Sequence, residues 1–222
     1  MCFSAGASFA GGVVISSIGV AAILKVEKPS QVVFASIPLC FGVQQFAEGV
    51  LWLAISRPDF VLAKDISAYI FLVLAQILWP MMVPLSVLLM EEKAGRKRAL
   101  WMLLASGCLS AMCSAYCLLF YKVDPQIVGF HVKYYNNIPR PLANAAFVVY
   151  LSATIAPLFV SSIKKMHLLG ALMFLSCLIA AVIFFQHLTS VWCFFAALIS
   201  GVIYWILVDA NRRSGLNPLV QT

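Results

Sequence analysis

The sequence predicts an all-α membrane protein, a bundle of seven transmembrane helices that forms one domain over residues 1–222. Composition is the first reason, since 63% of the residues are hydrophobic and 10% are charged, with a mean hydropathy of +0.99. A soluble domain is about half apolar and about a quarter charged. The second reason is that the apolar residues form continuous runs of about 20 residues, the length that crosses a bilayer as a helix. The net charge of +7 comes from basic residues beside these runs, so we expect contact with the lipid bilayer and no binding to nucleic acid.

Charged and proline-containing segments interrupt the apolar runs and set the limits of the spans. We expect the spans at about residues 5–24, 31–55, 66–90, 99–121, 143–163, 168–187 and 191–208. The longest connection covers residues 122–142, in which Val128–Tyr135 has strand-like composition and the Asn- and Pro-rich part after it predicts a turn. A loop of this length in a compact protein is usually a lid, a binding loop or disordered.

The connections differ in basic charge, which predicts the orientation in the membrane. One side holds Lys25, Lys28, Lys93, Arg96, Lys97, Arg98, Lys164, Lys165, Arg212 and Arg213. The other side holds only Arg57, Lys64, Lys122, Lys133 and Arg140. Because cytoplasmic loops carry the excess of Lys and Arg, we expect the C-terminus in the cytoplasm and the N-terminus outside.

Two local patterns predict how helices pack and bend. Ser8, Gly12 and Ser16 recur at four-residue spacing in the first span, which lets another helix approach closely. In the third span, Pro80 has no backbone N–H, so we expect the carbonyl of Gln76 to lose its helical partner. Bent backbone is tolerated in a membrane where protein or water satisfies such groups.

Glu48 is the acidic residue placed well inside an apolar run, in the second span. An ionisable group inside a membrane is costly and is by default a hypothesis about function. Gln44, Gln45 and Trp52 lie near Glu48 on one helical face at three- and four-residue spacing. By topology, Gln76 and the ends of the last two spans come to a similar depth. We therefore expect an outward-facing polar pocket around Glu48.

Three segments are similar to a family of uncharacterised bacterial multi-pass membrane proteins. They are Met1-Cys2-Phe3-Ser4-Ala5, the Gln44–Trp52 stretch, and Trp192-Cys193-Phe194-Phe195-Ala196-Ala197. Trp79-Pro80 and the His131-x-x-Tyr134 loop also resemble this family. The resemblance implies a seven-helix architecture in the bacterial inner (cytoplasmic) membrane and no particular activity.

The leading functional hypothesis is that the pocket binds a small molecule or a cation, as a sensor or a carrier. The expected ligand-binding residues are Gln44, Gln45, Glu48, Trp52, Gln76, Trp79, His187 and Trp192. These side chains would otherwise be hydrogen-bonding links between helices, packing residues or interface anchors. The absence of an internal repeat weakens the carrier hypothesis.

Three other hypotheses stay open. A metal-dependent hydrolase would use Glu48 with His131 and His187 to bind zinc or iron. A disulfide between Cys2 and Cys193 would form if both cysteines face an oxidising compartment. The protein could instead be a non-catalytic subunit of a membrane complex, and the sequence names neither an oligomeric state nor a protein partner.

Overall fold

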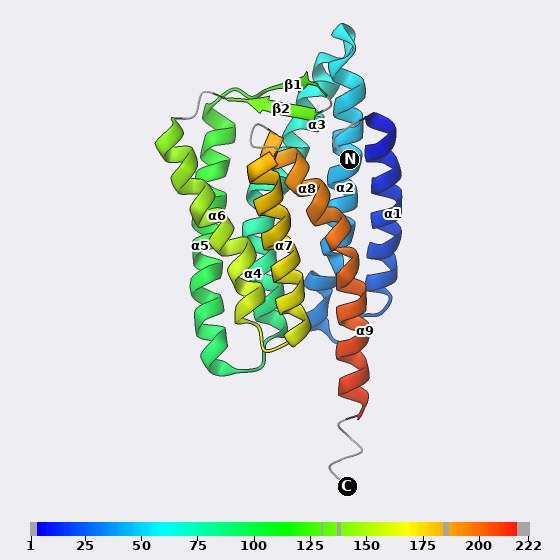
Figure 1. Ribbon diagram of the computed structural model, residues 1–222, viewed down its shortest axis with the longest axis vertical. Helices are drawn as coiled ribbons and strands as arrows, with labels where there is room; N and C mark the ends of the chain where they lie inside the picture. The colour runs from blue at the N-terminus through cyan, green and yellow to red at the C-terminus, as the bar shows by residue number, and fades with distance from the viewer. Residues whose placement is uncertain (1–3, 130, 137–138, 184–186, 217–222) are drawn as a thin grey trace.

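The computed structural model describes residues 4–129, 131–136, 139–183 and 187–216. Within this part of the chain, 7 helical spans are long and apolar enough to cross a membrane, as expected (Figure 1). The helices are α1 (Ala5–Ile23), α2 (Val32–Ile55), α3 (Val61–Leu72), α4 (Trp79–Met90), α5 (Ala94–Phe120), α6 (Arg140–Val160), α7 (Lys164–Ile183), α8 (Leu188–Ile199) and α9 (Gly201–Leu216). The third span is α3 and α4 joined by a π-helical segment, and the seventh span is α8 followed by α9.

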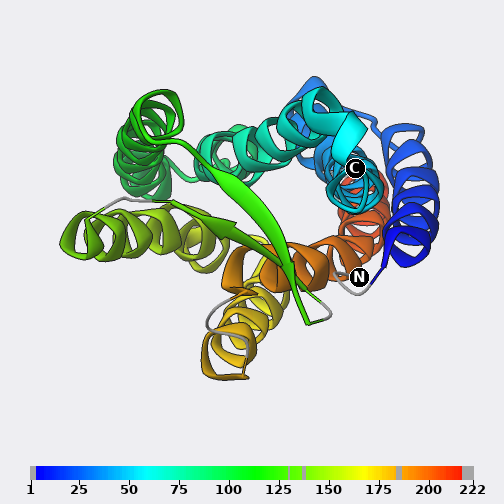
Figure 2. The ribbon, with the colours of Figure 1, turned by 90° about the horizontal axis from the view of Figure 1, so that it is seen from above.

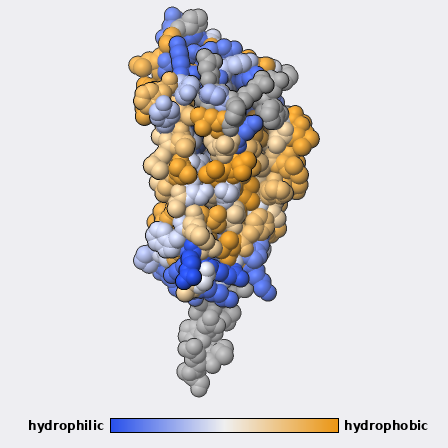
Figure 3. Space-filling view, turned by 90° about the vertical axis from the view of Figure 1, so that its left-hand side faces the viewer, coloured by the Kyte–Doolittle hydropathy of each residue, from blue (hydrophilic) through white to orange (hydrophobic). Residues whose placement is uncertain are grey.

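On the face shown in Figure 3, an apolar band crosses the middle of the bundle between two polar ends. Large apolar side chains point outward along the helices, such as Leu119 on α5 at 81% exposed and Val182 on α7 at 75%. Contiguous exposed apolar surface of this kind marks contact with a membrane or a partner. The protein is therefore a multi-pass membrane protein in composition, helix length and surface.

The small residues of α1 pack against α2, as their spacing predicts. Ser8 and Gly12 are buried in this contact. A Cβ atom at Gly42 of α2 would overlap the hydroxyl of Ser16, so the two backbones approach closely here. The stripe is a packing surface between the first two spans.

The third span changes its helical register at Val73–Leu78, the π-helical segment η3. In a π-helix each N–H bonds to the carbonyl five residues earlier. Pro80, five residues after Ala75, has no N–H to donate to the Ala75 carbonyl, and our expectation that the Gln76 carbonyl loses its helical partner stays a prediction. The Tyr150 hydroxyl, from α6, donates a hydrogen bond to the Ala75 carbonyl at 2.7 Å.

The connection after α5 forms a hairpin of β1 (Asp124–Val128) and β2 (His131–Tyr135). The strands are antiparallel, and Val128 pairs with His131. Gly129, at the turn, has a φ of 65°, a conformation that glycine adopts without steric cost. The strand-like composition is confirmed, but it belongs to two strands, with the turn inside the predicted Val128–Tyr135 segment.

The hairpin crosses one end of the bundle, above the helix ends (Figure 2). Val132 is fully buried there, and the Tyr134 ring stacks on Phe71 of α3 with centroids 5.3 Å apart. Lys64 Nζ also lies 3.2 Å from Asp124 Oδ1. We call this the hairpin end, and the opposite one the C-terminal end.

At the C-terminal end, Glu91 links two connections between helices. Its carboxylate accepts hydrogen bonds from the backbone N–H groups of Glu92 at 3.1 Å, Lys93 at 3.0 Å and Ser162 at 2.6 Å. Burial raises the pKa of Glu91, but these hydrogen bonds outweigh it and hold the pKa below its usual value. The hydrogen bonds of Glu91 therefore link the α4–α5 connection to the α6–α7 connection.

The seventh span breaks at Ser200, between α8 and α9, which was not expected from the sequence. The Ser200 hydroxyl donates to the carbonyl of Ala197 at 2.6 Å, and the Ser200 N–H donates to Ala196 at 2.9 Å. Gly/Ser pairs are a common cause of sharp helix kinks.

Candidate functional site

The predicted polar cluster of α2 is fully buried. Gln44, Gln45 and Glu48 are each 0% exposed. The Ser190 hydroxyl, in the first turn of α8, donates a hydrogen bond to Glu48 Oε1. A buried polar group is costly unless it is hydrogen-bonded, so this bond joins α2 to α8 at the depth of Glu48.

Gln44 links α2 to α4. Trp79 Nε1 donates a hydrogen bond to Gln44 Oε1 at 2.9 Å. Phe41, one turn earlier on α2, stacks on the Trp79 ring with centroids 3.9 Å apart. Two of the predicted ligand-binding residues, Gln44 and Trp79, are thus direct neighbours.

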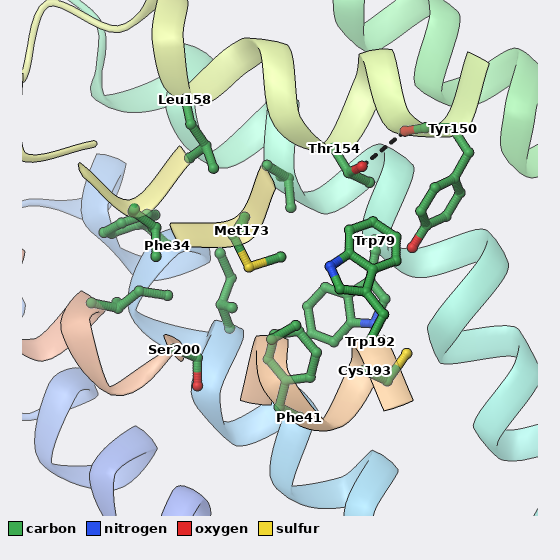
Figure 4. Close-up of a pocket in the computed structure, with 15 residues that line it drawn as sticks. Phe34, Phe41, Trp79, Tyr150, Thr154, Leu158, Met173, Trp192, Cys193 and Ser200 are labelled. Carbon is green, nitrogen blue, oxygen red and sulfur yellow. Dashed lines mark hydrogen bonds between the residues drawn. The ribbon is translucent and has the colours of Figure 1, made fainter. Parts of the chain in front are cut away.

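A cavity of about 50 Å³ lies inside the bundle next to this contact (Figure 4). Its lining comes from α2, α4, α6, α7, α8, Ser200 and α9. The lining residues are Phe34, Ile37, Phe41, Trp79, Val83, Tyr150, Thr154, Leu158, Leu169, Met173, Trp192, Cys193, Ala196, Ser200 and Ile203. Ligand sites are commonly apolar and aromatic, with a few polar groups that fix orientation.

The cavity contains part of the predicted ligand set. Trp79 and Trp192 line it, whereas Gln44, Gln45, Glu48, Trp52, Gln76 and His187 do not. Phe41 and Glu48 are seven positions apart on α2, which places Glu48 about 10 Å along the axis toward the hairpin end. The polar cluster therefore lies between the cavity and the hairpin.

Other lining residues, such as Tyr150, Thr154, Met173 and Ser200, were not predicted as site residues. Each lies in an apolar run with no charge and no motif around it. The proline at position 80 was the one indirect signal for Tyr150, because it implied a carbonyl in need of a donor.

The two histidines of the metal hypothesis come together at the hairpin end. The rings of His131 on β2 and His187 before α8 have centroids 4.9 Å apart. Burial, and then the nearby His187, lower the pKa of His131. Among the described residues, no group of three or more His, Cys, Asp or Glu side chains could hold a metal ion. The pairing was expected from topology, and a metal role for Glu48, His131 and His187 stays a prediction.

The remaining predicted residues have varied surroundings. Trp52 is half-buried, and its Nε1 has no hydrogen-bond partner within the described ranges. Gln76 is half-buried in η3. Cys193 is buried beside Gln44, but Cys2 lies outside the described residues, so their disulfide stays a prediction.

Residues 1–217 match a family of unknown function, DUF6629. The chain belongs to this family. No curated protein and no solved structure matches the chain. Because the function of DUF6629 is unknown, the match assigns no ligand or reaction, and a functional inference depends on the site itself.

Proposed function

We propose that this DUF6629 protein binds a small molecule within the membrane, as a sensor or a carrier, and that the ligand occupies the central cavity. The observation that carries the proposal is the cavity of about 50 Å³ lined by aromatic and aliphatic side chains of six helices. The side chains that line an unfilled space lose van der Waals contacts, which lowers the stability of the fold. A bound ligand restores those contacts.

The aromatic walls support a binding role. Phe41 and Trp79 form one stacked pair, and Tyr150 packs edge-on against Trp192 with centroids 5.8 Å apart. These four rings come from four different helices, so a ligand between them would be sensitive to relative helix movement. Such coupling is what a sensor or a carrier requires.

The Glu48 cluster lies on the hairpin side of the cavity, behind its lining. Glu48 lies near enough to the Cys193 thiol, a lining group, to interact with it electrostatically. Gln44 holds the Trp79 ring that forms another part of the lining. Glu48→Gln should therefore weaken ligand binding through the position of these walls.

The proposed orientation places the hairpin end outside and the C-terminal end in the cytoplasm. The connections at the C-terminal end carry most of the Lys and Arg residues, which favours the cytoplasmic side. The proposed location is the cytoplasmic membrane of a bacterium, as the family resemblance implies. The hairpin would then cover the outer mouth of the bundle.

Native mass spectrometry of the protein released from its own membranes tests the proposal. We expect a bound small molecule on the wild type and its loss in Ala196→Leu, because Ala196 lines the cavity and the larger side chain would fill it. Ala10→Leu, at an exposed position of α1, is the matched control and should retain the ligand.

The proposal fails if the wild type carries no small molecule and no small apolar compound stabilises it against heat. It also fails if a bound molecule persists in Ala196→Leu at the wild-type level, since the cavity would then not be its site.

A further inference from the structure

The polar groups on the cavity wall define the chemistry of the ligand. We propose that the ligand is a neutral, largely apolar molecule with a hydrogen-bond acceptor, such as a carbonyl oxygen, and that the indole N–H of Trp192 binds this acceptor. The inference rests on the proposed function and adds a ligand class and a specificity-determining residue to it.

Trp192 supplies a buried donor that the described protein leaves unused. The residue is 6% exposed, and its Nε1 has no hydrogen-bond partner in the ranges that the structure describes. Its ring projects from α8 into the cavity, with the nitrogen on the cavity side (Figure 4). An indole nitrogen can only donate, so the group that satisfies it has to be an acceptor.

The other polar groups of the lining already use their protons within the protein. The Tyr150 hydroxyl donates to Ala75, the Thr154 hydroxyl donates to the Tyr150 carbonyl at 2.9 Å, and the Ser200 hydroxyl donates to Ala197. These three oxygens are acceptors toward the cavity. The free strong donor among the described lining residues is therefore Trp192, which makes it the group that selects an acceptor.

Among the described residues of the lining there is no Asp, Glu, Lys, Arg or His side chain. Moving an ion from water into such a wall is costly unless a counter-charge pairs with it. The nearest candidate, Glu48, lies outside the lining and already accepts a hydrogen bond from Ser190. Aromatic faces attract cations, but that attraction is about 0.5–2 kcal/mol and does not replace a lost hydration shell. The wall thus favours a neutral ligand over a cation, which the sequence alone left open.

Three probes of matched size test the ligand class: cyclopentanone, cyclopentane and cyclopentylammonium. Their binding to the full chain in lipid nanodiscs is measured by ligand-observed NMR, with empty nanodiscs as the blank. We expect cyclopentanone to bind about tenfold more tightly than cyclopentane, as one hydrogen bond to a buried donor predicts. Cyclopentylammonium should bind most weakly of the three.

Trp192→Phe removes the donor and keeps an aromatic ring. In this variant cyclopentanone and cyclopentane should bind equally well. Trp205→Phe is the matched control, since Trp205 is 47% exposed on α9 and does not line the cavity. This control should keep the tenfold preference.

A measurement on the wild type tests the same hydrogen bond without depending on whether the Trp192→Phe variant folds. With ¹⁵N-labelled tryptophan, cyclopentanone should shift one buried indole N–H proton resonance downfield, and cyclopentane should not. Equal binding of ketone and hydrocarbon to the wild type, or tightest binding of the ammonium probe, would overturn the ligand class while leaving the cavity a binding site. Failure of all three probes to bind the wild type would instead overturn the proposed function.

Discussion

Tyr150→Phe should lower the free energy of unfolding by about 1–3 kcal/mol, the usual cost of leaving a buried acceptor unsatisfied. The phenylalanine ring keeps the shape of the tyrosine but cannot donate to the carbonyl of Ala75, which is 3% exposed. Pro80, the residue five positions later, has no N–H to replace the lost donor. The change therefore isolates one hydrogen bond between α6 and η3.

Thermal unfolding in lipid nanodiscs measures this loss, which corresponds to about 2–4 °C per kcal/mol for a chain of this size. Tyr116→Phe is the matched control, because Tyr116 is 54% exposed on α5 and should lose almost nothing. Pro80→Ala supplies a backbone N–H to this part of the helix. In that background Tyr150→Phe should cost clearly less, which a double-mutant cycle detects as a coupling energy.

Two results would refute the reasoning. The first is a loss in Tyr150→Phe no greater than in Tyr116→Phe. The second is the same loss with and without Pro80, which would show that the proline does not create the need for the tyrosine hydroxyl.

Three further predictions concern packing, charge and metal content. Gly107→Ala should lower the free energy of unfolding by about 1–3 kcal/mol, because the new Cβ would overlap the Pro80 carbonyl. Gly95→Ala on the same helix is the control for thermal unfolding, since its Cβ meets nothing within 4 Å and stability should not change. The pKa of Glu91 is lower in the folded protein, so the ionised carboxylate contributes its full stabilisation above the ordinary carboxyl pKa of about 4.3, and this contribution is lost as pH falls through the folded pKa. In Glu91→Gln the free energy of unfolding should therefore fall less steeply at acid pH than in the wild type. The same pH dependence in both proteins would contradict this role of Glu91. Elemental analysis should find the same metal content in the wild type and His187→Ala, and stoichiometric zinc or iron lost in the variant would support the hydrolase hypothesis.

The candidate site was predictable where it contains polar residues. Glu48, Gln44 and Trp79 stood out because amides, carboxylates and indoles are costly inside a membrane and need partners. Their convergence follows from helix order and depth, which topology alone gives. The partner of Glu48, Ser190, was not predictable, since a serine at a helix start is equally a cap or a packing residue.

The register of the third span could not be predicted, although its cause could. Pro80 predicts that one backbone carbonyl lacks its helical hydrogen bond. This is the carbonyl four residues earlier if the preceding turn is α-helical, and five residues earlier if it is π-helical. Tyr150, whose hydroxyl donates to Ala75, is 75 residues away in sequence and reaches this carbonyl only in the folded bundle.

By itself the sequence determined the membrane class, the approximate spans and Glu48 as the first functional candidate. Runs of about 20 apolar residues, and a carboxylate inside such a run, can be recognised from the local sequence alone. Only the tertiary structure decided where a ligand would fit. Exposed and core-facing positions of a membrane helix are both apolar, so Trp192 in the cavity and the exposed Trp205 look alike in the sequence. The packing of six helices around one space separates them.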